Sequence, residues 1–280
     1  MNCKVIVNGE SGNCKRLDLC ALLNMLQCPT AEVQYIDRHT NWNCDDNDTL
    51  VVCGGDGTLK NALAKCKGRN LIFAPCGTLN ESKFFGKQID YIGAVNNELF
   101  GYVCATGTFT EIGYLADNKH KQRFKALAYL PLVLKTYKCH QIDAKIDIDG
   151  RNLDGKYTLI MAIKSKRCFG FYFNRAYDNH KGLYILCVRS VGKNTLWNKI
   201  KLFWQFFRIF ILGIDKPLET KRFFLLPFEN AYVTLKSPQD FCMDGEKRTL
   251  QGKLHFCKQS VNPPIQIVKT PFLKGKNKPK

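Results

Sequence analysis

Residues 49–58, TLVVCGGDGT, place one carboxylate among three glycines directly after a short apolar run. The uninterrupted aliphatic residues of that run predict a strand that is buried on both faces of a parallel sheet. Gly54, Gly55 and Gly57 leave the following backbone open, so phosphate oxygens can approach its N–H groups closely. A phosphate repels the carboxylate of Asp56 unless that group holds a metal ion or takes up a proton. The segment therefore favours phosphate chemistry at Asp56 over passive anion binding.

A helix predicted at residues 59–67 points its N-terminus at the same glycines, which also favours an anion there. The alternative is a tight strand-to-helix turn in which Asp56 caps the helix. An isolated Gly-Gly-Asp is more typical of that turn. The other motifs of the chain decide between the two interpretations.

Two further glycine turns follow predicted strands. A strand at residues 4–7 ends in Asn8-Gly9-Glu10-Ser11-Gly12 and leads to an amphipathic helix at residues 16–26. A strand at residues 71–74 ends in Pro75-Cys76-Gly77-Thr78-Leu79-Asn80. With another strand at residues 33–36, strands and helices alternate over the first hundred residues, which implies a parallel sheet with ligands at the carboxyl ends of its strands. All three glycine turns then fall at that edge.

The second half of the chain has a different pattern. Residues 124–137 form an apolar, helix-like stretch, and short alternating runs such as AKIDIDG, YTLIMAIK and AYVTLKS follow from residue 140 onward. Alternation bounded by Gly, Asn and Asp predicts antiparallel sheet, so we expect a β-rich second domain. Near its end, Met243-Asp244-Gly245-Glu246 sets two carboxylates around a glycine, which by itself is typical of a hairpin turn.

Residues 194–212, NTLWNKIKLFWQFFRIFIL, are the most apolar stretch of the chain. Residues that recur near the helical period predict a face packed on the β-rich domain; they are Leu196, Ile200, Phe203, Phe207 and Phe210. Trp197, Trp204 and Phe206 fall off that face, beside cations that suit anionic lipid headgroups. An interfacial helix is therefore the alternative, and both interpretations can hold together.

The chain has 280 residues, 45% of them hydrophobic, and this length fits two modest domains. Its formal charge of +18 favours polyanionic partners, namely nucleotide phosphates, anionic lipid headgroups or nucleic acid, although a lysine-rich composition also serves solubility alone. The basic tail at residues 274–280 suits an anionic membrane surface. No basic helix, aromatic stacking motif or zinc module supports nucleic acid, which we do not expect as a partner.

The cysteines also bear on the class of protein. Fourteen of them are scattered without a CxxC pair, which predicts reduced thiols and argues against a structural zinc site. The N-terminus lacks a basic-then-apolar leader, and no stretch of about 18 residues is free of charge. We therefore expect a cytoplasmic protein without a membrane-spanning segment.

Four of these motifs match, in order and spacing, the soluble bacterial diacylglycerol kinases and their lipid-kinase relatives, which include the sphingosine kinases. Residues 8–12 resemble the family's Asn-Pro-x-Ser-Gly turn, residues 54–58 its glycine-rich loop, residues 75–80 its Pro-x-Gly-Thr-x-Asn turn and residues 244–246 its late Asp-Gly-Glu. NAD kinases partly share the glycine-rich loop. The resemblance covers nearly the whole chain.

The resemblance implies a fold and its boundaries. An α/β N-terminal domain, like that of NAD kinases and phosphofructokinases and built on a parallel sheet, precedes a β-sandwich C-terminal domain. We expect the nucleotide-binding α/β domain at residues 1–101 and the β-rich lipid-binding domain at residues 102–257. Residues 258–280 are expected to return to the first domain and to end in the basic tail.

The resemblance also implies an ATP-dependent lipid kinase, with diacylglycerol converted to phosphatidic acid as the leading reaction. Asp56 would accept or organise the proton of the substrate hydroxyl. Asp244 and Glu246 would hold Mg²⁺, a water or the same proton, and which carboxylate is the base stays open. Mg²⁺ would bridge the phosphate oxygens. The residues implied near ATP are Asn8, Ser11, Gly12, Lys15, Gly54, Gly55, Gly57, Thr58, Gly77, Thr78 and Asn80.

Several positions depart from the family pattern. Gly9 replaces a proline, Asn61 a glutamate, Glu81-Ser82 an Asn-Asp-Phe continuation and Tyr102 an asparagine. These positions are expected to line the substrate-binding cleft, so the identity of the lipid substrate stays open. A sphingoid base, ceramide or a polyprenol would use the same catalytic residues. An NAD kinase is the nearest alternative enzyme, although residues 75–80 and 244–246 fit the lipid kinases better. A catalytically silent lipid or nucleotide sensor is the other alternative, which the replacements at Asn61 and Tyr102 suggest.

A lipid substrate implies reversible, peripheral attachment to anionic membrane lipids. Homodimers are common among the family's members, but no feature of this sequence marks an interface.

Overall fold

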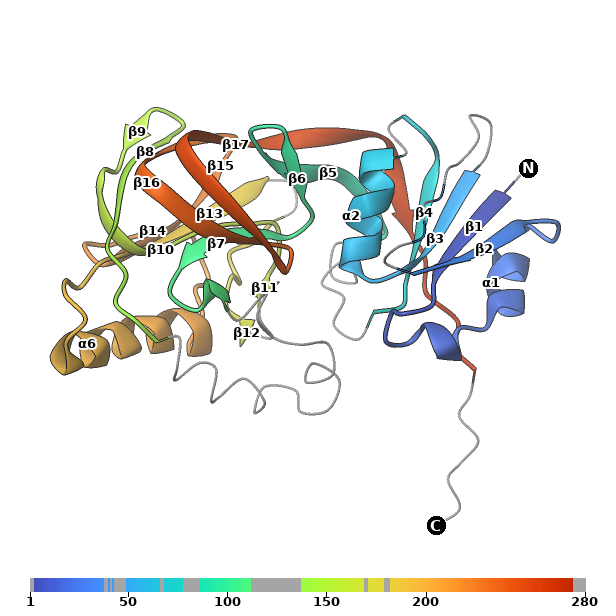
Figure 1. The fold of residues 1–280 in the computed structure, drawn as a ribbon, viewed down its shortest axis with the longest axis horizontal. Helices are drawn as coiled ribbons and strands as arrows, with labels where there is room; N and C mark the ends of the chain where they lie inside the picture. The colour runs from blue at the N-terminus through green and yellow to red at the C-terminus, as the bar shows by residue number, and fades with distance from the viewer. Residues whose placement is uncertain are drawn as a thin grey trace, which may run out of the picture. The chain divides into compact units, whose positions relative to one another are not determined.

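The computed structural model describes residues 3–37, 40, 42, 49–65, 68–77, 86–111, 137–168, 171–178 and 182–273 (Figure 1). The chain divides into two compact units, one of Met1–Tyr91 with Ser260–Lys280 and the other of Ile92–Gln259. Some predicted features lie outside the described residues: Thr78, Asn80, Glu81, Ser82, the apolar stretch at residues 124–136 and the basic tail.

The first unit is built on a parallel sheet. Its strands are β1 (Cys3–Asn8), β2 (Glu32–Ile36), β3 (Thr49–Gly54) and β4 (Leu71–Pro75), in the order β2-β1-β3-β4. The end of β17 (Glu246–Ile267) adds a further parallel strand beside β4. β3 is buried along its whole length, as its uninterrupted aliphatic residues predict. The predicted parallel sheet is confirmed.

The helices of this unit begin at different residues from those predicted. α1 covers Leu19–Met25, because Asp18 caps it by accepting a hydrogen bond from the Ala21 N–H at 3.0 Å. A short 3₁₀ turn, Cys14–Arg16, precedes α1 and includes residue 16, at which the predicted helix begins. α2 covers Asp56–Lys65, so it begins three residues earlier than predicted and includes Asp56 in its first turn.

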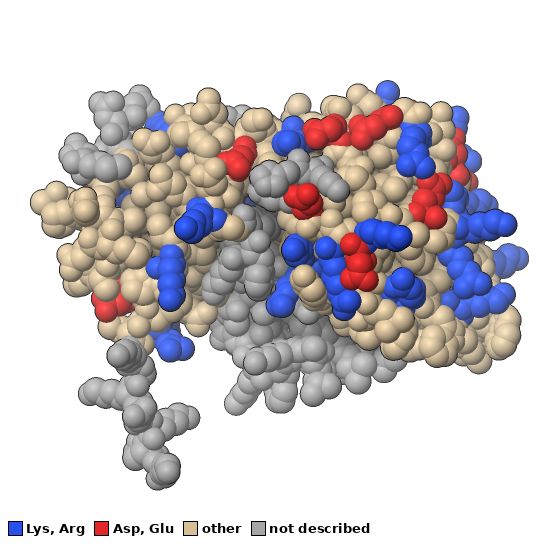
Figure 2. Space-filling view, turned by 180° about the vertical axis from the view of Figure 1, so that it is seen from behind, with Lys and Arg blue, Asp and Glu red and all other residues tan. Residues whose placement is uncertain are grey.

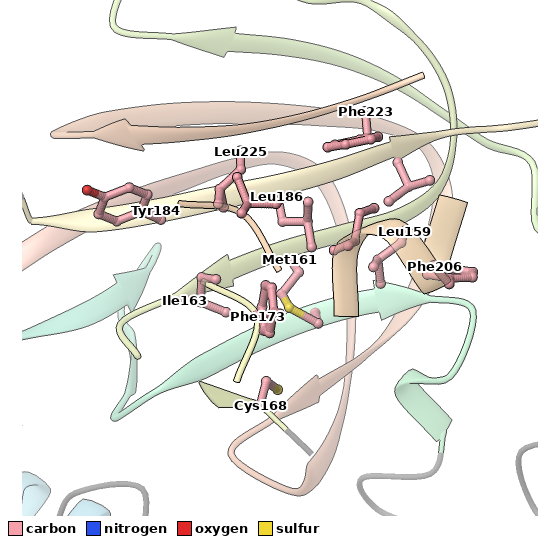
Figure 3. Packing of buried hydrophobic residues seen from close by; sticks show 14 of the residues in the cluster. Leu159, Met161, Ile163, Cys168, Phe173, Tyr184, Leu186, Phe206, Phe223 and Leu225 are labelled. Carbon is pink, nitrogen blue, oxygen red and sulfur yellow. The ribbon is translucent and has the colours of Figure 1, made fainter. Parts of the chain in front are cut away.

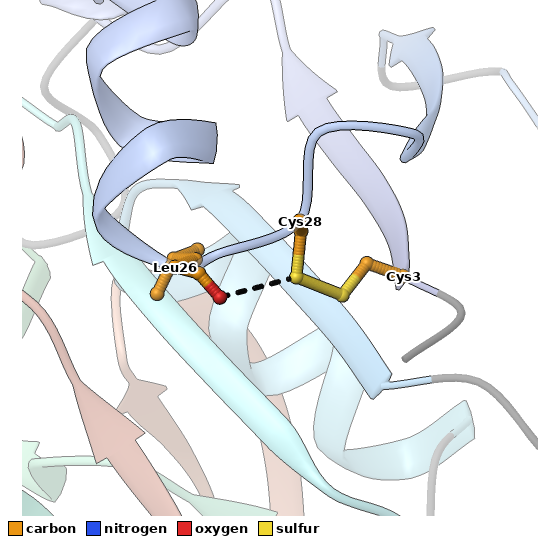
Figure 4. The surroundings of a disulfide bond; sticks show 3 residues. All are labelled: Cys3, Leu26 and Cys28. Carbon is orange, nitrogen blue, oxygen red and sulfur yellow. Dashed lines mark hydrogen bonds between the residues drawn. A yellow bond between two sulfur atoms is a disulfide. The ribbon is translucent and has the colours of Figure 1, made fainter.

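A disulfide bond joins Cys3, at the start of β1, to Cys28, just after α1 (Figure 4). The prediction of reduced thiols is wrong for this pair. The strand and the helix that follows it bring the two Cα atoms to 6.2 Å, within the range that a disulfide spans. Ten other described cysteines are free thiols, so the prediction holds for them.

The second unit is an antiparallel β structure, as the alternating runs predict. Its longer strands are β7 (Val103–Gly107), β8 (Ile142–Ile148), β10 (Gly155–Ile163), β13 (Leu183–Arg189), β15 (Phe223–Phe228) and β16 (Asn230–Met243), and β17 begins here. Shorter strands are β6 (Glu98–Phe100), β9 (Arg151–Asn152), β11 (Arg167–Cys168), β12 (Phe171–Tyr172) and β14 (Leu218–Glu219), and β5 (Gln88–Val95) leads into the unit. Both β7 and β8 pair with β10 and with β16, so the sheet closes on itself. The pairing is barrel-like, where the resemblance implied a β-sandwich.

Helix α6 (Leu196–Phe206), continued by a π-helical turn at Phe207–Ile211, packs on the core of this unit. Its buried side chains include Leu202, Phe206 and Ile209, which meet the inward residues of β10, β13 and β15 (Figure 3). The predicted inner face is wrong for Leu196, Ile200 and Phe203, which are exposed, and Phe206 is buried instead. Phe210 does pack against the core, as predicted. Of the helices that the structure describes, none has both the length and the hydrophobicity to cross a bilayer.

Candidate active site

The loop after β1, which includes the first glycine turn, forms hydrogen bonds with both of the other glycine turns of the first unit, which follow β3 and β4. The Asn8 side-chain amide donates to the Thr58 hydroxyl at 2.8 Å, and the Ser11 hydroxyl accepts from the Gly55 N–H at 3.2 Å. Asn13 donates from its backbone N–H to the Cys76 carbonyl at 2.8 Å and from its side chain to the Gly77 carbonyl at 3.0 Å. The three glycine turns therefore meet at the carboxyl ends of β1, β3 and β4, as the sequence predicts.

Asn13 is a positioning residue that the sequence analysis missed. It stands just beyond the motif that ends at Gly12, and its two partners lie more than sixty positions away. Its placement directly after a Ser-Gly turn is a weak signal, since asparagine is common in such turns for local reasons.

Gly54 has a steric reason to be glycine. A Cβ added there would lie 2.5 Å from the Cβ and the hydroxyl oxygen of Thr58. The Gly54 carbonyl also accepts hydrogen bonds from the Cys76 N–H at 2.7 Å and the Gly77 N–H at 3.2 Å. The close approach of backbone and side chain at Gly54 thus fixes the mutual position of all three turns.

Replacing Gly54 with alanine is expected to lower the free energy of unfolding by about 1–3 kcal/mol, because the new methyl group displaces Thr58 from Asn8. Gly57→Ala is the matched control. A Cβ at Gly57 meets nothing within 4 Å, and alanine favours the helix by roughly 1 kcal/mol. Urea unfolding measures the free energy of unfolding of both variants. Equal values would show that the close contact between residue 54 and Thr58 does not affect stability.

The surface of this cluster offers polar groups and open backbone. Gly12 and Gly57 are exposed, and Asn8, Ser11 and Asp56 are half-buried. Asp56 lies in the first turn of α2, where the helix N-terminus favours negative charge. Lys15 is exposed on the 3₁₀ turn, so its charge lies in solvent in this structure. Open space beside Gly57 is what close approach of a phosphate to the backbone needs.

Three buried thiols, those of Cys14, Cys53 and Cys76, lie beneath the turns. The Cys14 thiol faces the Cys53 carbonyl at 3.8 Å. Its hydrogen bond with the Cys76 thiol, and then burial, raise the pKa of Cys14 well above the ordinary value. The hydrogen bond with Cys14 lowers the pKa of Cys76, but a hydrogen bond with Cys53 and burial outweigh it and raise that pKa to about 12. Cys14 and Cys76 are therefore neutral thiols at physiological pH.

Iodoacetamide at neutral pH is expected to modify Cys20 in the native chain and to leave Cys14 and Cys76 unmodified. The thiolate is the reactive form, and these two thiols are protonated and buried, whereas Cys20 is exposed. Peptide mapping by mass spectrometry measures each site, and labelling in urea serves as the control for intrinsic reactivity. Native labelling of Cys14 as fast as Cys20 would contradict the protonated, buried state.

Asp244 lies in the second unit, in the turn between β16 and β17, so the predicted hairpin turn is confirmed. One carboxylate oxygen accepts from the Gly101 N–H at 2.6 Å, and the other accepts from the Tyr102 and Val103 N–H groups at 3.0 Å each. The Asp244 N–H donates back to the Val103 carbonyl at 3.0 Å. Asp244 therefore fixes the backbone before β7, a role that the sequence analysis missed.

Glu246 is exposed and forms an ion pair with Arg248 at 3.0 Å, and Arg248 also pairs with Glu98 at 3.2 Å. Within the described part of the chain, no group of three or more His, Cys, Asp or Glu side chains is arranged to hold a metal ion. Three backbone N–H groups occupy three of the roughly four lone-pair sites of the Asp244 carboxylate. Direct coordination of Mg²⁺ by Asp244 would therefore compete with these hydrogen bonds.

The structure therefore brings most of the expected nucleotide-binding residues together with Asp56 in the first unit. This group is Asn8, Ser11, Gly12, Lys15, Gly54, Gly55, Gly57, Thr58 and Gly77. Asp244 and Glu246 belong to the second unit, and Thr78 and Asn80 lie outside the described residues.

Comparisons with known proteins agree with this fold. A diacylglycerol kinase from Staphylococcus carnosus strain TM300 is 28% identical over 152 residues, which cover 45% of this chain and 49% of that protein. The crystal structure of a diacylglycerol kinase from Bacillus anthracis strain Sterne superimposes with a TM-score of 0.61 at 14% identity, covering 96% of this chain and 97% of the other. The chain has the diacylglycerol kinase fold. A candidate diacylglycerol kinase from the same organism superimposes with a TM-score of 0.66 at 17% identity, covering 94% and 97%.

The predicted resemblance to the diacylglycerol kinase superfamily is thereby confirmed. The chain spans about half the length of the curated diacylglycerol kinase that it matches. No family model matches it.

Proposed function

We propose that this chain is an ATP-dependent lipid kinase that phosphorylates the hydroxyl of a membrane lipid, with diacylglycerol as the leading substrate and phosphatidic acid as the product. The observation that carries the proposal is the cluster of three hydrogen-bonded glycine turns with Asp56 in the first turn of α2. The diacylglycerol kinase fold and the similarity to the Staphylococcus carnosus protein support it.

The turns bind the nucleotide phosphates in this proposal. Phosphoryl transfer needs positioned donors around the phosphate oxygens more than covalent help from the protein. The exposed backbone at Gly57 and the N-terminus of α2 supply such donors, and the bonds from Asn8, Ser11 and Asn13 keep the turns in place without reorganisation. Lys15, Thr78 and Asn80 keep their expected places near ATP as part of the proposal.

Asp56 is the proposed proton acceptor for the lipid hydroxyl. It is a half-buried carboxylate beside the open glycine backbone, so it can reach a group held next to the phosphates. Mg²⁺, when bound, would neutralise charge on the phosphate oxygens. We assign Asp244 to positioning of the backbone before β7, and the pairing of Glu246 with Arg248 supports a role outside direct metal coordination.

The test is transfer of radiolabelled γ-phosphate from ATP to micellar diacylglycerol, ceramide, a sphingoid base and a polyprenol, with NAD as a soluble acceptor. Labelling of diacylglycerol supports the proposal in full, and labelling of another lipid supports the kinase while replacing its substrate. Labelling of NAD alone overturns the lipid substrate. ATP binding without transfer to any acceptor would identify a catalytically silent relative.

A further inference from the structure

Helix α6 is fixed to the second unit through one stripe of its surface. Leu202 and Ile209 are fully buried and Phe206 is 6% exposed. The Thr195 hydroxyl caps the helix by accepting from the Asn198 N–H, and the Tyr137 hydroxyl donates to the Lys199 carbonyl. Because these contacts fix the rotation of the helix about its axis, they determine which side chains face away from the core.

The side that faces away is also apolar. Its exposed fractions are 77% for Leu196, 67% for Trp197, 41% for Ile200, 52% for Phe203, 60% for Trp204 and 51% for Ile211. These residues recur at helical spacing, so they form one strip opposite the buried stripe. The Phe203 and Trp204 rings lie 5.6 Å apart, and the Trp204 and Phe207 rings 5.9 Å. A contiguous aromatic strip of this kind marks an interaction surface.

Cations border the strip, and acidic residues are absent from the sequence around it. At 100° per residue, Lys199 falls along one edge of the strip and Lys201 and Arg208 along the other. Residues 179–214 contain six Lys or Arg and no Asp or Glu. In Figure 2, which shows one face of the molecule, many Lys and Arg side chains lie over the Ile92–Gln259 unit, with several Asp and Glu side chains among them.

The hairpin of β11 and β12 extends this surface beyond the helix. Phe171 and Tyr172 are 41% and 42% exposed, and the Phe171 ring lies 5.9 Å from that of Phe210. The Arg167 guanidinium lies 5.4 Å from the centre of the Tyr172 ring, and that of Arg175 lies 5.8 Å from it. Arg175 also pairs with Asp215 at 3.5 Å. Exposed aromatic rings and cations therefore occur together here as well.

We propose that the outward strip of α6, with Phe171 and Tyr172 of β12, is the surface through which this protein docks on an anionic lipid bilayer. Indole rings suit the headgroup level because they are apolar bodies with one polar edge, and Lys and Arg beside them meet anionic headgroups. Protein–protein interfaces, by contrast, are depleted in lysine. The proposal rests on this surface alone and stands whether or not the kinase proposal does.

The experiment is co-sedimentation of the full chain, without ATP, with vesicles of phosphatidylcholine alone or mixed with phosphatidylglycerol. The wild type is expected to bind the mixed vesicles more tightly, with a blue shift of tryptophan fluorescence. The double variant Trp197→Ser, Trp204→Ser removes two exposed rings and is expected to weaken binding by roughly tenfold or more. Tyr35→Ser is the matched control, since Tyr35 is an aromatic residue on β2 that is 66% exposed.

Unchanged vesicle binding by the double variant, or an equal loss in Tyr35→Ser, overturns the proposal. Circular dichroism and thermal unfolding verify that each variant is folded. Protection of the tryptophans from aqueous acrylamide without vesicles would mean that another segment of the chain covers the strip. If the wild type forms a concentration-dependent dimer and the double variant does not, the strip binds a second copy of this chain. Either result also overturns docking on lipid, and neither bears on phosphoryl transfer.

Discussion

Replacing Asp56 with asparagine is expected to slow phosphoryl transfer by about 10²–10⁴-fold and to leave the fold intact. Asparagine has nearly the same shape and is accepted at a helix N-terminus, so α2 should still begin at the same residue. The amide cannot take up the proton of the attacking hydroxyl, and the step then depends on solvent. The loss should therefore appear in kcat, with ATP affinity unchanged or improved by removal of a negative charge.

Asp18→Asn is the control for this substitution. Asp18 also stands at the start of a helix and accepts the Ala21 N–H at 3.0 Å, but it lies outside the glycine turns. Radiolabel transfer under saturating ATP and lipid gives kcat for both variants, and equilibrium binding gives the affinity for ATP. If Asp56→Asn keeps the wild-type kcat, the Asp56 carboxylate is not the proton acceptor in phosphoryl transfer. A loss of ATP binding would instead assign it to positioning of the turns.

The parallel sheet and the meeting of the glycine turns were predictable because they depend on local signals. β3 is an uninterrupted aliphatic run, and a run buried on both faces belongs in the middle of a parallel sheet. Strands that end in glycine turns then meet at one sheet edge. The bonds of Asn13 with Cys76 and Gly77 were beyond prediction, since they join positions far apart in sequence.

Helix α6 shows why its packing could not be derived from the sequence. The helix is apolar on two opposite faces, so periodicity indicates a helix without indicating which face is buried. That choice is made by residues of distant strands, such as Leu159 and Met161 on β10 and Leu186 on β13. The disulfide of Cys3 with Cys28 likewise depends on how α1 returns to the start of β1, and no local spacing signals it.

Asp244→Ala is expected to lower the free energy of unfolding by about 2–4 kcal/mol. The change leaves the N–H groups of Gly101, Tyr102 and Val103 without the carboxylate that accepts from them. It also places alanine at a φ of 51°, which asparagine and aspartate tolerate better. Asp244→Asn keeps an oxygen for two of these donors and should cost about 1–2 kcal/mol. Urea unfolding measures both variants.

Asp149 offers a matched control, because it has a φ of 48° and accepts from the backbone N–H groups of Glu229 and Asn230. It is exposed, so water can replace the lost acceptor and Asp149→Ala should cost less than Asp244→Ala. The kinase assay of folded Asp244→Asn then separates two roles. If Asp244 only holds the backbone before β7, the rate per folded molecule stays within a few-fold of the wild type. A loss as large as that in Asp56→Asn would instead place Asp244 among the groups that touch the reacting atoms, and the three N–H donors would then serve to orient its carboxylate.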